Sequence, residues 1–201
     1  MASSQVRVAE RTEVPGVIRL LAEGMRDDPL LAWVYPDPAS RTRRVERLFG
    51  LVARLYPDAE VFRNDDLSAG AFWVRPGRFH VPVGRQIRLF PATAKALGGM
   101  AGLGMSAAVD ASHPKEPDHY YLLILATAPG NRGRGLGTEL MRPVLERCDA
   151  DGVPAYLESA NQRNQPFYER LGFEVRQEID LPGGCPPLWG MWREARSSVA
   201  N

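Results

Sequence analysis

The chain has 201 residues, 44% of them hydrophobic, so it can bury the core of one domain or of one domain with an insert. Its 25 Lys and Arg against 24 Asp and Glu leave a net charge of +1, which gives no electrostatic case for a nucleic-acid or membrane partner. The 2 cysteines make neither a disulfide framework nor a zinc site, so we expect no metal ion. No stretch approaches membrane-spanning length and the start lacks an apolar signal core, which favours a cytoplasmic protein.

Residues 1–74 predict a strand, two helices and a hairpin. Thr12 can cap the first helix, which has Pro15 in its first turn and ends near Asp27 and Asp28. We expect that end because Pro29 disfavours helical backbone in the residue before it. The expected ranges are 6–9 for the first strand, 12–28 and 40–56 for the helices, and 59–63 and 68–74 for the hairpin strands.

Residues 81–112 break this rhythm because they are rich in Gly, Ala and Met. Gly98, Gly99, Gly102 and Gly104 interrupt a helical spacing, which predicts two loosely packed helices inserted before the next strand. Such an insert could be a mobile lid or the wall of a pocket. The alternative is a crowded surface where two helices approach closely. An extended tether, residues 113–117, then returns the chain to the sheet.

The stretch that follows predicts an anion site. An apolar run over 122–126 indicates a buried strand, and a helical pattern begins near Leu136. Between them, Gly133, Gly135 and Gly137 alternate with larger residues, so backbone N–H groups are presented without side chains in the way. Together with the positive end of the helix dipole, this arrangement suits a phosphate.

The spacing of this loop excludes two common nucleotide motifs. A P-loop requires a lysine before Thr138, and the dinucleotide pattern started at Gly133 requires a glycine where Thr138 stands. The pattern that remains is R-x-x-G-x-G from Arg132, with Arg134 adding positive charge at the rim. The alternative is a glycine-rich connection that binds no ligand.

A carboxylate stands on the next predicted strand. The helix should run over 136–148 and end at 151–152, and the strand covers 153–159. Tyr156 and Glu158 share one face of that strand. Because a carboxylate in a covered sheet is costly to bury alone, Glu158 either meets a buried base or opens onto a cleft. A short helix over 167–171, strands over 173–175 and 186–192, and a frayed tail over 196–201 complete the chain.

Two motifs now carry a resemblance to a known family. The loop from Arg132 to Gly137 resembles the pyrophosphate loop of the GNAT superfamily of acyl-CoA N-acyltransferases. The spacing N-x-x-F-Y-x-x-x-G-F from Asn164 to Phe173 is similar to the other signature of that superfamily. Both stand in the expected order, and the resemblance is weaker over 1–113.

The resemblance implies a mixed α/β fold in one domain over 1–201. Its central sheet of about six to seven strands would have helices on both faces and would splay between the strands at 122–127 and 155–159. The helical insert would occupy about 81–113, and the coenzyme-binding core about 118–175.

The resemblance also implies acetyl-CoA as co-substrate. The pantetheine arm would enter the splayed gap and pair with the strand at 125–127, and the pyrophosphate would sit on the glycine loop. Asn164 would face the pantetheine arm. The coenzyme-binding residues implied are Leu125, Ala126, Thr127, Arg132, Gly133, Arg134, Gly135, Leu136, Gly137, Thr138, Asn164, Phe167 and Tyr168.

Acyl transfer to an amine needs a proton acceptor, an oxyanion donor and an acid for the leaving thiolate. Tyr168, near the thioester sulfur, fits the acid, and its alternative role is that of a core aromatic. Many relatives have a glutamate in the strand before the glycine loop, but that strand is wholly apolar here. Glu158 is therefore the first candidate for the base and His119 the second, although either could serve only to hold the ammonium group.

The acceptor we expect is a small cationic primary amine, for example an aminonucleoside antibiotic in resistance or detoxification. It would be held by Asp27, Asp28 and Glu158, with Phe90, Met100 and Met105 beside it. Asp27 and Asp28 could equally be solvated loop charges.

Two alternatives remain open. The first is a protein or peptide N-acetyltransferase, against which the helical insert argues because it would cover the acceptor site. The second is a non-catalytic acyl-CoA-binding module. We expect a monomer or a homodimer.

Overall fold

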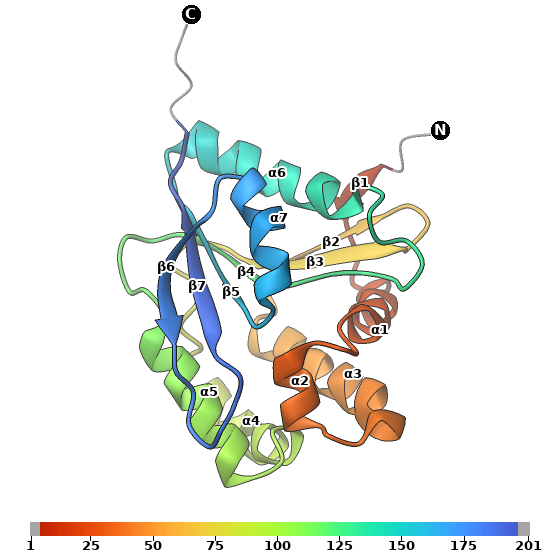
Figure 1. Ribbon diagram of the computed structural model, residues 1–201, viewed down its shortest axis with the longest axis vertical. Helices are drawn as coiled ribbons and strands as arrows, with labels where there is room; N and C mark the ends of the chain where they lie inside the picture. Colours follow the sequence, from red (N-terminus) through yellow and green to blue (C-terminus); the bar gives the residue numbers. More distant parts are fainter. Residues whose placement is uncertain (1–4, 197–201) are drawn as a thin grey trace, which may run out of the picture.

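One mixed sheet organises the molecule (Figure 1). The computed structural model describes residues 5–196, except the side chains of residues 100 and 101. Within that range the sheet has seven strands in the order β1-β2-β3-β4-β5-β7-β6, which confirms the predicted mixed sheet. The strands are β1 Val6–Val8, β2 Glu60–Asn64, β3 Ala69–Val74, β4 Tyr120–Thr127, β5 Ala155–Ser159, β6 Glu174–Ile179 and β7 Leu188–Arg193.

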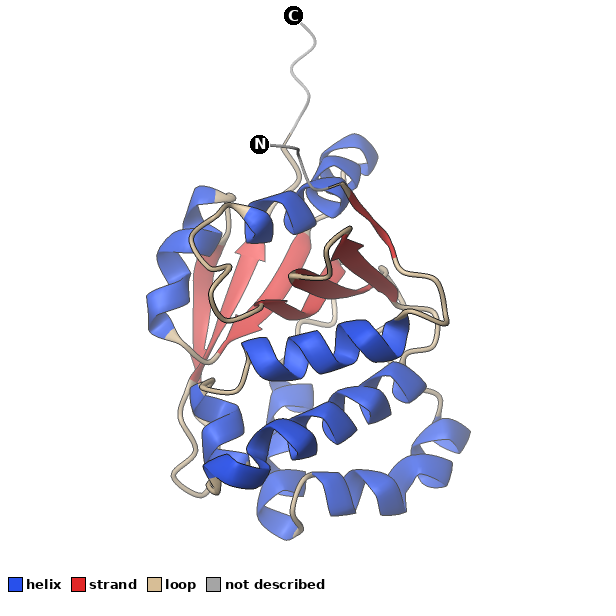
Figure 2. Ribbon diagram, turned by 90° about the vertical axis from the view of Figure 1, so that its right-hand side faces the viewer, coloured by secondary structure: helices blue, strands red, loops and turns tan. Residues whose placement is uncertain are grey.

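Helices cover both faces of the sheet, as expected (Figure 2). Leu140 and Met141 of the glycine-loop helix are fully buried in the cluster on one face, and Leu21 and Phe49 belong to the cluster on the other. Each such side chain stabilises the fold by about 1.5–3 kcal/mol. The helices are α1 Val14–Gly24, α2 Pro29–Val34, α3 Pro38–Leu55, α4 Val83–Ala96, α5 Met100–Ser112, α6 Leu136–Asp151 and α7 Gln165–Arg170, with a 3₁₀ turn at Gln162–Asn164. In residues 5–196 no helix is long and apolar enough to cross a membrane.

The strands β4 and β5 diverge along their length. They pair in parallel only at Tyr120↔Ala155, Tyr121↔Tyr156 and Leu122↔Leu157. On its other edge β4 stays paired with β3 as far as Thr127. The last five residues of β4 therefore turn one backbone edge toward a gap, and the expected splay is confirmed.

The region between the first and second predicted helices differs from expectation. The first helix ends at Gly24, and a short extra helix, α2, follows Asp28. The carboxylate of Asp28 caps α2 by accepting from the N–H groups of Leu30 at 3.0 Å and Leu31 at 3.1 Å. Pro29 therefore marks a helix start here, since proline is favoured in the first turn.

The predicted cap of the first helix was also wrong. Its N-cap residue is Glu13, with no side-chain cap bond, in place of Thr12. The Glu13 carboxylate instead binds the guanidinium groups of Arg7 at 2.6 Å and Arg63 at 2.5 Å. At the other end of the chain, residues 197–201 of the predicted tail lie outside the described residues.

The insert forms the two helices that its sequence predicted, α4 and α5, at the far end of the molecule from α6 (Figure 1). A Cβ atom at Gly102 would overlap the carbonyl oxygen of Leu97, the C-cap residue of α4, so the connection between the two helices is tight at that point. Leu97 and Met105 are buried against Leu188 of β7.

A substitution at Gly24 tests the contact between α1 and β4. A Cβ atom there would lie 2.8 Å from the Cβ of Ala126 and 2.8 Å from the carbonyl oxygen of Thr127. We expect Gly24→Ala to lower the free energy of unfolding by about 1–3 kcal/mol in urea denaturation because backbone must shift.

The matched control is Gly50→Ala in α3. A Cβ at Gly50 meets nothing within 4 Å. It should stabilise the protein by about 0.5–1 kcal/mol through helix propensity. If the two substitutions changed the free energy of unfolding equally, α1 would not be in tight contact with β4 at Gly24.

Candidate active site

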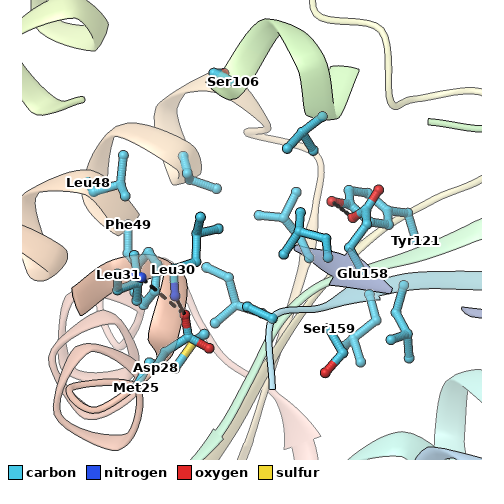
Figure 3. Close-up of a pocket in the computed structure, with 18 of the residues that line it drawn as sticks. Met25, Asp28, Leu30, Leu31, Leu48, Phe49, Ser106, Tyr121, Glu158 and Ser159 are labelled. Atoms are coloured by element: carbon cyan, nitrogen blue, oxygen red, sulfur yellow. Dashed lines mark hydrogen bonds between the residues drawn. The ribbon is translucent and has the colours of Figure 1, made fainter. Parts of the chain in front are cut away.

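A cavity of about 340 Å³ opens where β4 and β5 part (Figure 3). Its floor is formed by the two strands, including Leu125 and Ser159, and α7 contributes Tyr168. Helices α2, α3, α4 and α5 form the remaining walls, so the insert is a wall of this pocket. Residues from both halves of the chain thus meet at one site.

The sequence predicted that Glu158 either meets a buried base or opens onto a cleft, and in the structure it does both. It lines the cavity, and its Oε1 lies 3.3 Å from Nδ1 of His113. Its Oε2 accepts a hydrogen bond from the hydroxyl of Tyr121 at 2.5 Å, as Figure 3 shows. The side chains of Glu158 and His113 are only 6% and 2% exposed. The carboxylate is therefore held in place by partners on β4 and on the tether.

His119 lies behind His113, away from the cavity. The two Nε2 atoms are 3.0 Å apart, and the Nδ1–H group of His119 donates to the carbonyl oxygen of Pro117 at 2.8 Å. Burial lowers the pKa of His119. His119 is not among the residues that line the cavity, so any action on a substrate would pass through His113 and Glu158.

Aromatic rings fix the orientation of His113. The ring of Phe79 stacks on it with centroids 3.5 Å apart and an interplanar angle of 9°. The ring of Tyr121 meets it edge-on at 4.7 Å. From the sequence, His113 was assigned only to the tether. A signal was available, because His113 and His119 flank a proline-rich loop that leads into β4, the strand that pairs with the strand of Glu158.

Tyr168 lies on α7 at the cavity, next to Asn164. It is buried, and burial together with the nearby Asp28 carboxylate raises the pKa of its hydroxyl. The hydroxyl therefore keeps its proton at neutral pH and can only donate it to a stronger base. That protonation state is the one an acid catalyst needs.

The glycine loop precedes α6. Gly133 and Gly135 have φ of +77° and +82°, and a Cβ added at either would meet nothing within 4 Å. The loop is therefore an open cradle at the first turn of α6, where N–H groups have no intrahelical partners. The guanidinium group of Arg132 reaches inward and donates to the carbonyl oxygen of Gly24 at 2.8 Å, which ties the loop to α1. Gly137 lies against the ring of Phe167.

The predicted acceptor residues do not all meet. Asp28 lines the cavity, on the side opposite Glu158 in Figure 3, while Asp27 is exposed and does not line it. Met105 lines the cavity, but Phe90 is 57% exposed and points elsewhere. The side chain of residue 100 lies outside the described part.

Sequence reasoning missed several polar residues at the cavity, among them Tyr121. Two others are Tyr56, which follows α3, and Asp110 on α5. Burial raises the pKa of Tyr56, and the charges of Asp110 and Glu158 raise it further. Nothing in the sequence connects these two residues with Glu158, because the fold alone brings their segments together.

Comparison with known proteins now identifies the family. The model of the Acetyltransferase (GNAT) family matches residues 54–173. An uncharacterized N-acetyltransferase of Schizosaccharomyces pombe is 38% identical over 65 residues, which is 32% of this chain and 26% of that protein, so the match spans about a quarter of the relative.

Similar solved structures extend over almost the whole chain. One described as histone acetyltransferase HPA2 and related acetyltransferase, from Corynebacterium glutamicum, has a TM-score of 0.72 and 27% identity over 98% of this chain and 99% of the other. The polyamine N acetyltransferase of Drosophila melanogaster has a TM-score of 0.61 and 18% identity over 96% and 100%. The family match covers more than half of the sequence, and the chain belongs to the acetyltransferase (GNAT) family.

Proposed function

We propose that this protein transfers the acetyl group of acetyl-CoA to the primary amine of a small molecule, by direct attack in a ternary complex. The observation that carries the proposal is the cavity between the diverging strands, which has a buried carboxylate, Glu158, and a protonated tyrosine, Tyr168, on its walls. Membership of the acetyltransferase family supports it.

The residues present fit a coenzyme with a diphosphate and an extended arm. The positive φ values and empty surroundings of Gly133 and Gly135 leave room for phosphate oxygens beside the N–H groups of 132–138. The free edge of β4 at Leu125, Ala126 and Thr127 offers backbone partners to an amide-containing arm. Asn164 and Phe167 border the same space from the start of α7.

The two cavity residues divide the proton chemistry. A cationic amine must lose a proton before it can attack, and the Glu158 carboxylate is the acceptor that we assign. The leaving thiolate takes a proton, and the Tyr168 hydroxyl is the donor. An oxyanion partner is available in the N–H groups of β4 that face the gap.

A covalent acetyl-enzyme on cysteine has little support. Burial raises the pKa of the Cys148 thiol to about 12, and the residue is fully buried on the side of α6 that faces the core. Burial also raises the pKa of the Cys185 thiol. Neither residue lines the cavity. Thiolates at these positions would be rare at neutral pH, which favours direct attack.

The walls of the cavity support a cationic amine with an apolar body. Glu158 and Asp110 supply negative charge near Tyr56. We assign the ammonium group to this pair in place of Asp27 and Asp28, because the Asp28 carboxylate is already engaged as a helix cap. Apolar side chains surround the rest of the space: Leu48, Val52, Leu55, Phe79, Met105 and Val109.

Two acceptor classes follow for the first tests. The solved relative from Drosophila melanogaster catalyses the formation of N-acetylagmatine. From the runs HPKEPDHYYL and RNQPFYERLGFEV of this chain we infer a resemblance to puromycin N-acetyltransferase. We therefore propose polyamines and aminonucleosides as candidates. Residues of α4 and α5 line the cavity, and such a wall argues against a long peptide as acceptor.

The glycine loop is tested by an isosteric pair of variants at Gly135. Asparagine and aspartate tolerate the left-handed backbone of this residue similarly, so only the aspartate adds negative charge beside the phosphates. In calorimetry Gly135→Asp should bind acetyl-CoA on the order of tenfold or more weaker than Gly135→Asn. Equal affinity of the two folded variants would remove this loop from the coenzyme site.

The acid is tested by Tyr168→Phe. The variant should keep the affinity for acetyl-CoA and lose about 10- to 1,000-fold in kcat, because the thiolate then leaves unprotonated. Stopped-flow detection of free thiol gives the rate. A donor with a more acidic thiol should lose less. Wild-type turnover in the variant would assign Tyr168 to packing alone.

The acceptor end is tested by Asp110→Asn with a panel of polyamines, arylalkylamines, puromycin and a histone-tail peptide. Asp110 is exposed, so KM for cationic amines should rise only about two- to fivefold, with kcat little changed. Asp58→Asn, an exposed aspartate outside the cavity, is the control. Efficient acetylation of the peptide with no reaction of any small amine would contradict the assignment.

A further inference from the structure

Four groups, each within hydrogen-bonding distance of the next, form a row that ends at the cavity. The row runs from the Pro117 carbonyl to His119 at 2.8 Å, from His119 to His113 at 3.0 Å, and from His113 to Glu158 at 3.3 Å. A carbonyl oxygen can only accept, so Nδ1 of His119 carries a hydrogen. Nε2 of a neutral His119 is then an acceptor, and Nε2 of His113 must be the donor to it.

The row contains one proton fewer than its hydrogen bonds would require. Three links need three protons, and two neutral imidazoles bring only two. Without a third, Nδ1 of His113 and Oε1 of Glu158 are two acceptors facing each other, which is unfavourable in a buried site. Tyr121 cannot supply the missing proton because its hydroxyl already donates to the other oxygen, Oε2.

We propose that Glu158 and His113 act as one base, whose shared proton is taken from the acceptor ammonium group, and that Pro117 sets this arrangement through His119. This inference rests on the proposed function. Glu158 is the residue that touches the substrate. His113 and His119 are positioning residues, since neither lines the cavity.

The proton balance of the step is simple. An N–H bond of the ammonium group breaks and leaves its electron pair on nitrogen, while an O–H bond forms on Glu158 or an N–H bond on His113. Taking up that proton turns the repulsive contact between Nδ1 of His113 and Oε1 of Glu158 into a hydrogen bond. The second amine proton, lost as the amide forms, balances the one that Tyr168 gives to the thiolate. The pair finally releases its proton to water.

Three tyrosines lie near this pair. Burial raises the pKa of Tyr121 on β4, Tyr156 on β5 and Tyr56 after α3, so the three hydroxyls stay neutral. The charge of Asp110 acts to raise the pKa of Tyr56, and the charge of Asp118 acts to raise the pKa of His119. Burial lowers the pKa of His119, which opposes placing the positive charge there. The remaining histidine, His80, is exposed and edge-on to Phe79.

Imidazole ¹⁵N NMR tests the row without any substrate. The chain has only 3 histidines, so His80→Gln completes their assignment. At high pH we expect hydrogen on Nδ1 of His119 and on Nε2 of His113, with Nδ1 of His113 bare. On lowering the pH, Nδ1 of His113 should change as the shared proton enters. A neutral His113 with its hydrogen on Nδ1 would overturn the inference.

A matched variant, His119→Gln, links the row to the reaction. The glutamine amide can reach the position of Nε2 and donate to His113, which frees His113 to hold its hydrogen on Nδ1 and donate to Glu158. The pH at which half of the pairs hold the extra proton should then fall by about one pH unit. The kcat/KM profile should move to lower pH with it. His80→Gln, the same change at an exposed site, should move neither.

The outcomes separate this inference from the proposed function. Unchanged midpoints in His119→Gln, by NMR and by kcat/KM, would overturn the inference even if amines are acetylated. If none of the amines in the panel is acetylated, the proposed function is overturned. The inference depends on that function and falls with it, whatever the NMR spectra show.

Discussion

The structure depends on the point at which β4 and β5 stop pairing. Three residue pairs hold the strands together, and beyond Leu122 and Leu157 they separate. A parallel sheet that is continuously paired would leave no free backbone edge and no space at its centre. The gap is kept open because each strand is anchored on its other side, β4 by β3 and β5 by β7.

The two hydrophobic clusters act on opposite faces of this divided sheet. One joins α6 and α7 to the sheet and the other joins α1, α2 and α3 to β4 and its neighbours. Arg132 connects them, because it extends from the glycine loop before α6 to the carbonyl of Gly24 at the end of α1. The glycine loop and the cavity are therefore positioned by the same contacts that stabilise the core.

Glu158 is a buried carboxylate whose partners offset the cost of removing it from water and also fix its orientation. An isolated carboxylate is unfavourable away from water, yet this one has a tyrosine hydroxyl on one oxygen and an imidazole nitrogen on the other. The partners come from β4 and the tether before it, and Phe79 stacks on the imidazole from a third segment. Removing any of them leaves the carboxylate less well oriented toward the cavity.

The sequence predicted what is encoded locally. The apolar run before the glycine loop, the alternation around Glu158 and the glycines of the insert all report on neighbours within a few residues. The hairpin, the order of the elements and the splay followed from such patterns and from the resemblance. Asp28 was placed in the right loop, but its role as a cap for α2 was missed because α2 has only six residues.

The remaining features arise from tertiary contacts. His113 and Glu158 are separated by 45 residues and meet only because β4 and β5 are adjacent in the sheet. Asp110 and Tyr56 reach the cavity through the packing of α4 on α3 and of α5 on α4. The periodicity of apolar residues along the sequence carries no information about contacts between segments that are far apart in the chain. For the same reason the sequence predicted Thr12 as the cap of the first helix. It could not show that the neighbouring Glu13 binds Arg63, which lies on a distant strand.

The central claim is that an acetyl group passes directly between two molecules held together in the cavity. Initial rates of thiol release, with acetyl-CoA and the best amine both varied, test it most directly. Double-reciprocal lines that intersect, with no gain of an acetyl group in the intact mass of the protein incubated with acetyl-CoA alone, are the predicted result. Parallel lines together with an acetylated protein that passes its acetyl group to the amine would contradict it.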